Sequence, residues 1–162
     1  MIDTLKELSD KLNKMNDIKE IYKVVPQYEI RIEKILENSV FNRVEKESYY
    51  KTFESIISKR TKEIEIIGTL KNLKDQLGKI KNITEIKTNG TECKKLMSKI
   101  LENTSYNSNE KASYLNTIDS LVQNAINVQS KAAARGILVY RKKENNKKQE
   151  VLSKDIFSLE IV

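Results

Sequence analysis

Two Asn–Glu pairs with the same spacing are the first residues in this sequence that could do chemistry. Asn42 stands three residues before Glu45, and Asn107 stands three residues before Glu110. Such repeated polar pairs resemble paired active-site groups. The same spacing is also that of a capping box, in which Asn and Glu side chains bond to the backbone at the start of a helix. We favour the structural interpretation for both pairs.

Other residue types that carry out catalysis or bind metals are scarce. The chain has no histidine, which is the commonest general base and metal ligand, and its only cysteine is Cys93. One thiol cannot build a thiolate metal site, and a cysteine nucleophile usually needs a histidine partner. The glycines are isolated, so there is no glycine-rich phosphate loop. We therefore expect no enzyme activity, no metal, no cofactor and no small-molecule substrate.

A basic segment after residue 130 is the strongest functional lead. The whole chain has a net charge of +7, and residues 131–148 contain seven basic groups but only one acidic group, Glu144. A compact positive arm can neutralise phosphates and bind nucleic acid with little sequence preference. The alternative is that the charge reflects only a lysine-rich composition. The candidate nucleic-acid-binding residues are Lys131, Arg135, Arg141, Lys142, Lys143, Lys147 and Lys148.

Small polar residues at helical spacing are candidates for a protein interface. In two segments they lie four and then three residues apart, which places each set on one face of a helix. Such a face could join two parts of the chain or form a dimer seam, and a solvated face is the alternative. Apolar residues near the end of the chain are further candidates. The proposed interface residues are Ser48, Thr52, Ser55, Ser113, Thr117, Ser120, Phe157, Leu159 and Ile161.

These candidates recur because the sequence itself repeats. Residues 4–59 align without a gap onto residues 69–124, with 22 identities in 56 positions. Internal repetition marks stacked copies of one supersecondary unit. A unit of this size is marginal alone, so we expect the two copies to share an interface. We assign residues 1–67 to a first helical repeat, 68–130 to a second, and 131–162 to a basic C-terminal extension.

Apolar residues at spacings of three and four predict an all-α fold built from two tandem three-helix repeats. We expect the first helix of each repeat to end at an interruption, which is Pro26 in one copy and Asn89-Gly90 in the other. Gly68 supplies either a break between the repeats or a kink in one long helix, and we favour the break. The two repeats should pack into one helical body.

The C-terminal extension has apolar residues near both of its ends. Residues 136–140 are β-branched and apolar, and residues 157–161 alternate in hydrophobicity with a period of two. These segments can pair as a small antiparallel β-hairpin, which would need the helical body or a partner for support. The alternative is a helix that runs on through residues 137–143, followed by a loose tail.

The function expected from these features is binding rather than catalysis. No apolar run has the length of a membrane span, and the N-terminus does not resemble a signal peptide. A single cysteine fits a reducing compartment, so we expect a cytoplasmic protein without membrane contact. We expect a non-catalytic binding or assembly protein that contacts another protein, with a nucleoprotein complex as one setting and a homo-oligomer as a further possibility. Direct nucleic-acid binding through residues 131–148 is the alternative.

Overall fold

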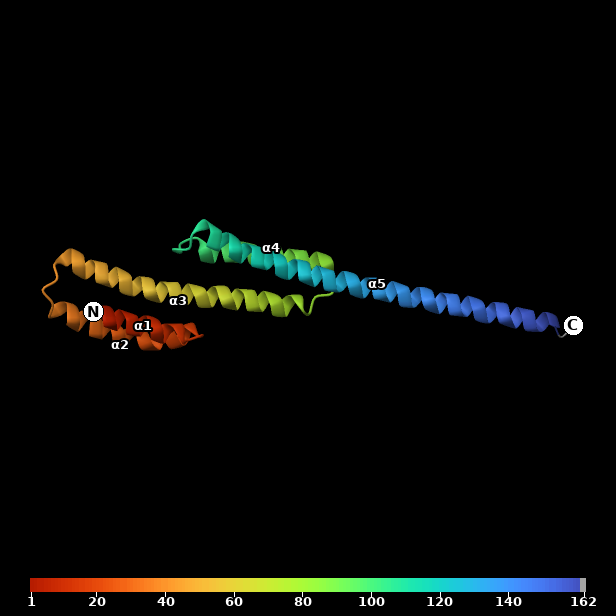
Figure 1. Ribbon diagram of the computed structural model, residues 1–162, viewed down its shortest axis with the longest axis horizontal. Coiled ribbons are helices and arrows are strands. Elements are labelled where there is room, and N and C mark those ends of the chain that lie inside the picture. The colour runs from red at the N-terminus through yellow and green to blue at the C-terminus, as the bar shows by residue number, and fades with distance from the viewer. Residues whose placement is uncertain (161–162) are drawn as a thin grey trace.

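The computed structural model describes the backbone of residues 1–160 and the side chains of residues 1–150, and its regular structure is entirely helical over that range. In Figure 1, α1 and α2 lie along the first half of α3, and α4 and the first half of α5 lie along its second half, on the other side. The molecule is therefore elongated, with two three-helix bundles that share α3. The helices are α1 (Ile2–Asn13), α2 (Ile18–Glu37), α3 (Arg43–Leu77), α4 (Ile83–Leu101) and α5 (Ser108–Glu160).

Capping boxes start the two longest helices. The Glu45 amide donates to Asn42 Oδ1 at 2.9 Å, and the Asn42 amide donates to the Glu45 carboxylate at 2.8 Å. Asn107 and Glu110 form the same two hydrogen bonds at the start of α5. These side chains satisfy backbone N–H groups that have no partner within the helix. The structural interpretation of both Asn–Glu pairs is therefore confirmed.

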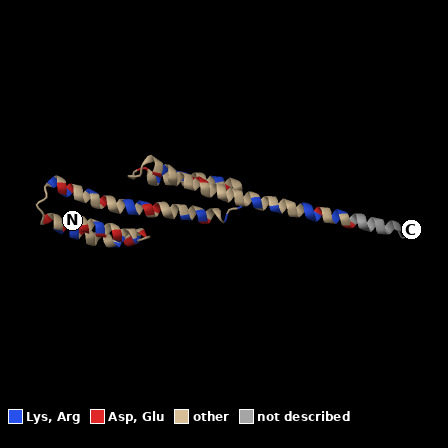
Figure 2. Ribbon diagram, in the orientation of Figure 1, with Lys and Arg blue, Asp and Glu red and all other residues tan. Residues whose placement is uncertain are grey.

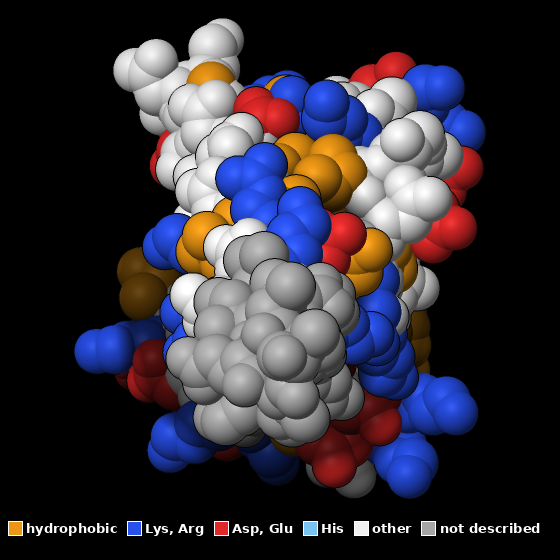
Figure 3. All heavy atoms as spheres, turned by 90° about the vertical axis from the view of Figure 1, so that its right-hand side faces the viewer, with side chains coloured by type: hydrophobic (Ala, Val, Ile, Leu, Met, Phe, Trp, Pro, Cys, Tyr) orange, Lys and Arg blue, Asp and Glu red, His pale blue; other side chains and the backbone are white. Residues whose placement is uncertain are grey.

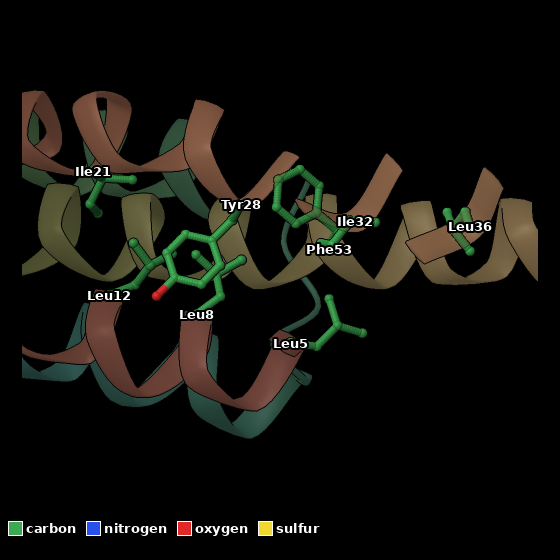
Figure 4. Packing of buried hydrophobic residues seen from close by; sticks show 8 residues of the cluster. All are labelled: Leu5, Leu8, Leu12, Ile21, Tyr28, Ile32, Leu36 and Phe53. Carbon is green, nitrogen blue, oxygen red and sulfur yellow. The ribbon is translucent and has the colours of Figure 1, made fainter. Parts of the chain in front are cut away.

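The first bundle has a core of leucine, isoleucine and aromatic side chains. The leucines of α1 point toward Tyr28 and Ile32 of α2 and toward Phe53 of α3 (Figure 4). Burying a large apolar side chain stabilises a fold by roughly 1.5–3 kcal/mol, so this core holds the three helices together. The buried members are Leu5, Leu8, Leu12, Ile21, Tyr28, Ile32, Leu36 and Phe53.

The second bundle has its core at corresponding positions. Seven of its eight buried core residues stand 65 positions after a buried core residue of the first bundle. Helices α2 and α4 also begin 65 positions apart, as do α3 and α5. Residues at this offset therefore have similar burial in the two bundles. The buried members are Ile66, Leu73, Leu77, Ile86, Cys93, Met97, Leu101 and Ile118.

The helix interruptions expected at three places are wrong. Pro26 lies inside α2, the pair Asn89-Gly90 lies inside α4, and Gly68 lies inside α3. An interior glycine costs a helix only about 1 kcal/mol, and an interior proline about 3 kcal/mol. The cores on either side of these residues outweigh such costs. As a result, the boundary that we expected between residues 67 and 68 falls within one continuous helix.

Of the two alternatives for the C-terminal extension, the structure has the continuing helix and not the β-hairpin. Residues 136–140 belong to α5, and residues 1–160 contain no strand. The helical part of that alternative is confirmed, but the loose tail expected after residue 143 is wrong, because α5 continues to Glu160. Alanine, lysine, arginine, glutamate and glutamine predominate around these residues, and they are the strongest helix formers. The apolar residues 137–140 are therefore helical as part of α5, which begins in the second bundle.

Candidate interaction surface

The second half of α5 extends beyond the second bundle. Helices α3 and α4 pack against its first half, whereas every residue from 131 to 150 is exposed. We call residues 131–150 the projecting segment. Lysine and arginine are frequent along it and acidic residues are few (Figure 2). Most helical stability in proteins comes from packing against other elements, so the stability of this exposed segment depends on its continuity with the bundle.

The seven candidate nucleic-acid-binding residues all lie on the projecting segment, but they do not share one face. At 3.6 residues per turn they divide among three sides of the helix. Seen end-on, basic side chains lie on several sides of the molecule, with hydrophobic ones between them (Figure 3). A single continuous basic face is therefore not formed. One side carries Lys131, Arg135 and Lys142, a second carries Lys143 and Lys147, and a third carries Arg141 and Lys148.

Four adjacent apolar residues interrupt the basic ones. Ile137, Leu138, Val139 and Tyr140 are between 55% and 65% exposed. Because neighbouring residues in a helix point about 100° apart, the four side chains encircle the segment. A helix that is hydrophobic on all sides is normally buried, and contiguous apolar surface often marks an interaction site. These residues form the main exposed apolar surface of the projecting segment.

The face of α5 that packs inside the second bundle continues along the projecting segment. Ile118, Val122 and Ala125 contribute to the bundle core at spacings of four and three. The same alternation leads on through Gln129 to three residues that are small or β-branched. We call these three the stripe, and its members are Ala132, Gly136 and Val139.

Helix α4 shows how closely this face of α5 can be approached. Gly90 of α4 lies against Val122, and a Cβ added to Gly90 would lie too close to Val122 Cγ2 for normal packing. Beside this contact, Lys94 Nζ of α4 lies 2.6 Å from Asp119 Oδ1 of α5. The contact therefore combines a small residue at its centre with an ion pair at its edge.

The six Ser and Thr candidates lie away from the projecting segment. All six are exposed, and Ser55 lines a hollow of about 180 Å³ between α3 and residues 103–106. Thr52 donates to the Ser48 carbonyl and Thr117 to the Ser113 carbonyl, within their own helices. Ser48 and Thr52 also line a hollow of about 420 Å³ between α1 and α3. The remaining interface candidates, Phe157, Leu159 and Ile161, lie outside the residues whose side chains are described.

An ion-pair cluster on the first bundle has a structural role. Both Arg31 Nη atoms donate to the Glu7 carboxylate at 3.1 Å, and Tyr28 Oη donates to it at 2.9 Å. The hydrogen bond from Arg31 is the main reason that the pKa of Glu7 is lowered, while burial is the main reason that the pKa of Tyr28 is raised. In the second bundle, Cys93 stands 65 positions after Tyr28, and a hollow of about 170 Å³ lies beside it.

Arg60 is a structurally important residue that sequence reasoning missed. Its guanidinium donates to the carbonyl oxygens of Leu12 at 3.0 Å and of Met15 at 2.6 Å, at the C-terminal end of α1. Cations at this end of a helix satisfy free carbonyls and interact favourably with the helix dipole. The corresponding residue of the second bundle is Ala125, which lines a hollow of about 310 Å³. An arginine in an otherwise apolar helical pattern is the signal that could have revealed this role.

Comparisons with known proteins do not assign a family to this chain. No protein-family model, curated protein or solved structure matches it. Within the described residues, no helix combines the length and the apolar composition needed to cross a membrane. In the same residues, no three His, Cys, Asp or Glu side chains are grouped so that they could hold a metal ion.

Proposed function

We propose that this protein is a non-catalytic, helical-repeat binding or assembly protein that contacts another protein through the projecting segment. The observation that carries this proposal is the exposure of four adjacent apolar residues, 137–140, on the projecting segment, every residue of which is exposed. Burying a large apolar side chain contributes roughly 1.5–3 kcal/mol when the burial is complete. Covering these half-exposed residues with a partner would supply part of that free energy at each position.

In this proposal the two bundles are copies of one unit. The shared offset of 65 positions in helix starts and core residues supports the duplication. Helix α5 then corresponds to α3, and α3 carries a bundle on each half. Within the described residues, α5 carries a bundle only on its first half. The projecting segment thus corresponds to the second half of α3, against which a helical bundle packs, and a further helical unit can pack on it in the same way.

Direct nucleic-acid binding is the second candidate. The exposure of all seven basic residues of the projecting segment favours it, because phosphates can be neutralised without a shaped pocket. The two candidates combine if the protein is a subunit of a nucleoprotein complex. The division of the basic residues among three sides, with apolar residues between them, favours protein contact as the primary function.

Site-specific photo-crosslinking of the full chain tests the proposed function. A photoreactive amino acid would replace Val139, and the matched control would place it at Lys51, an exposed residue of the first bundle. In extract from the native cell treated with nuclease, we expect one discrete crosslinked protein from position 139 and none from position 51. The same pattern from both positions would contradict the proposal.

Binding of labelled DNA and RNA to the full chain tests the second candidate. Affinity should be micromolar or better and fall steeply with salt if the basic residues neutralise phosphates. Changing Lys131, Arg135 and Lys142 to glutamine should then weaken binding further. Such a result, together with no protein crosslink from position 139, would replace protein contact by nucleic-acid binding.

A further inference from the structure

We infer that the partner presents an acidic amphipathic helix, which packs along the stripe and places its carboxylates beside the basic residues that flank it. This inference rests on the proposed function, because it names the chemistry of the partner at the same surface. It depends on two observations, which are the continuity of the stripe with the core of the second bundle and the charge of the projecting segment.

Continuity with the bundle core indicates a helical partner. The stripe has the alternation of four and three residues by which Ile118 and Val122 pack inside the bundle. That alternation suits a second helix lying at a shallow angle. A Cβ added at Gly136 would have no atom within 4 Å, so the chain itself leaves room there for a close approach. Since helix axes can come nearest where side chains are small, a helix fits the stripe better than an irregular peptide does.

Charge complementarity indicates that this helix is acidic. Lys131, Arg135 and Lys142 lie along one edge of the stripe. Lys143, four residues after Val139, lies at the end of the stripe on the same side of the helix. At the α4–α5 contact, Asp119 of α5 pairs with Lys94 of α4. On the projecting segment seven cations of α5 outnumber its two carboxylates, Glu144 and Glu150, so carboxylates of a partner would complement its charge.

A second copy of this chain is a poor occupant for the same reason. Two projecting segments would each bring seven basic groups and one acidic group between residues 131 and 148. Packed helix axes lie 8–10 Å apart, which is about one Debye length at physiological salt, so the repulsion would be only partly screened. Opposite charge, by contrast, accelerates association and excludes wrong partners.

The test uses the full chain and designed peptides of three heptads. The first peptide has leucine at its two core positions in each heptad and glutamate at the flanking positions, and the control peptide has lysine in place of glutamate. Fluorescence anisotropy should show the glutamate peptide binding at least about tenfold more tightly than the lysine peptide. Its affinity should also decrease as salt is raised, because the edge charges are exposed.

Two alanines provide matched variants for the stripe. Ala132 belongs to the stripe, whereas Ala134 points about 200° away from it on the same helix, and both are exposed. The substitutions Ala132→Glu and Ala134→Glu add the same charge only two residues apart along the chain, but on different sides of the helix. We expect Ala132→Glu to weaken binding of the glutamate peptide about tenfold and Ala134→Glu less than about threefold. Circular dichroism would verify that the variants have equal helix content.

Several results would overturn the inference. Failure of the glutamate peptide to bind, equal binding of the lysine peptide, or equal effects of the two alanine variants would each exclude an acidic helix on the stripe. Equally tight binding of unstructured polyglutamate or of single-stranded RNA would show that charge alone acts. A dimer of the full chain that Ala132→Glu dissociates would make a second copy the occupant. The crosslink from position 139 does not depend on the partner's charge, so the proposed function could survive these results.

Discussion

Replacing Gly90 by alanine tests the close approach of α4 and α5. The new methyl group would lie too close to Val122 Cγ2, so one of the two helices would have to shift. Overpacking of this kind typically costs about 1–3 kcal/mol. Alanine also gains about 1 kcal/mol over glycine in a helix interior. We therefore expect the free energy of unfolding to fall by roughly 0–2 kcal/mol.

Gly68→Ala is the matched control for this experiment. Gly68 also lies inside a long helix, but a Cβ there would have no atom within 4 Å. This variant should therefore gain about 0.5–1 kcal/mol from helix propensity alone. Urea unfolding of the wild-type chain and both variants gives the comparison, with the slope of the transition checked for constancy. Because both substitutions have the same propensity gain, the two variants should differ in stability by the overpacking cost of about 1–3 kcal/mol, with Gly90→Ala the less stable.

A gain in stability for Gly90→Ala as large as that for Gly68→Ala would refute the reasoning. It would mean that α4 and α5 are not in close contact at this point. A double variant that also has Val122→Ala provides a second test, since removing the Cγ atoms makes room for the new methyl group. We expect the two substitutions to be coupled by at least about 0.5 kcal/mol, as is usual for residues in contact.

Three further predictions concern the first bundle. Arg60→Met should lower the free energy of unfolding by about 1.5–3 kcal/mol, because the carbonyls at the end of α1 lose a charged donor. The control is Lys59→Met at an exposed position, which should change the free energy of unfolding by less than about 0.5 kcal/mol in the same urea titration. Pro26→Ala should raise the melting temperature, because a proline inside a helix costs about 3 kcal/mol relative to alanine; no increase would mean that packing around Pro26 compensates for the missing hydrogen bond. The hydrogen bond from Arg31 lowers the pKa of Glu7, so its stabilisation should be present above the ordinary pKa of 4.5 and disappear as pH falls through the folded value. The melting temperatures of wild type and Glu7→Gln should therefore differ near neutral pH and converge in acid, and a constant difference would contradict this assignment.

The sequence predicted the helical class and the capping boxes because both depend on local patterns. Asn42 and Glu45 are three residues apart, so the sequence alone can place their mutual contacts. The continuity of α3 through Gly68 could not be predicted in the same way. It depends on Ile64 packing in the first core and Ile66 in the second, and those contacts come from other helices.

The candidate site was predicted in composition but not in geometry. The charge of residues 131–148 is evident from the sequence, whereas its division among three sides follows only once the segment is known to be one helix. The role of Arg60 was also hidden, because its acceptors lie 45 and 48 residues earlier in the chain. An arginine within an apolar helical pattern can mark such a residue, but contacts over such separations leave no signal that identifies its acceptors.

The shared helix α3 fixes the rotation of one bundle relative to the other about the helix axis. Its 35 residues span about 52 Å, and the last contact with the first core and the first contact with the second, Ile64 and Ile66, are only two residues apart. Because two residues correspond to a rotation of about 200° around the helix, the two bundles lie on opposite sides of α3. One residue inserted after Glu65 would turn the second bundle, and the projecting segment with it, by about 100°, while seven inserted residues would nearly restore the phase. The number of residues in α3 between the two cores therefore determines the direction in which the projecting segment points relative to the first bundle.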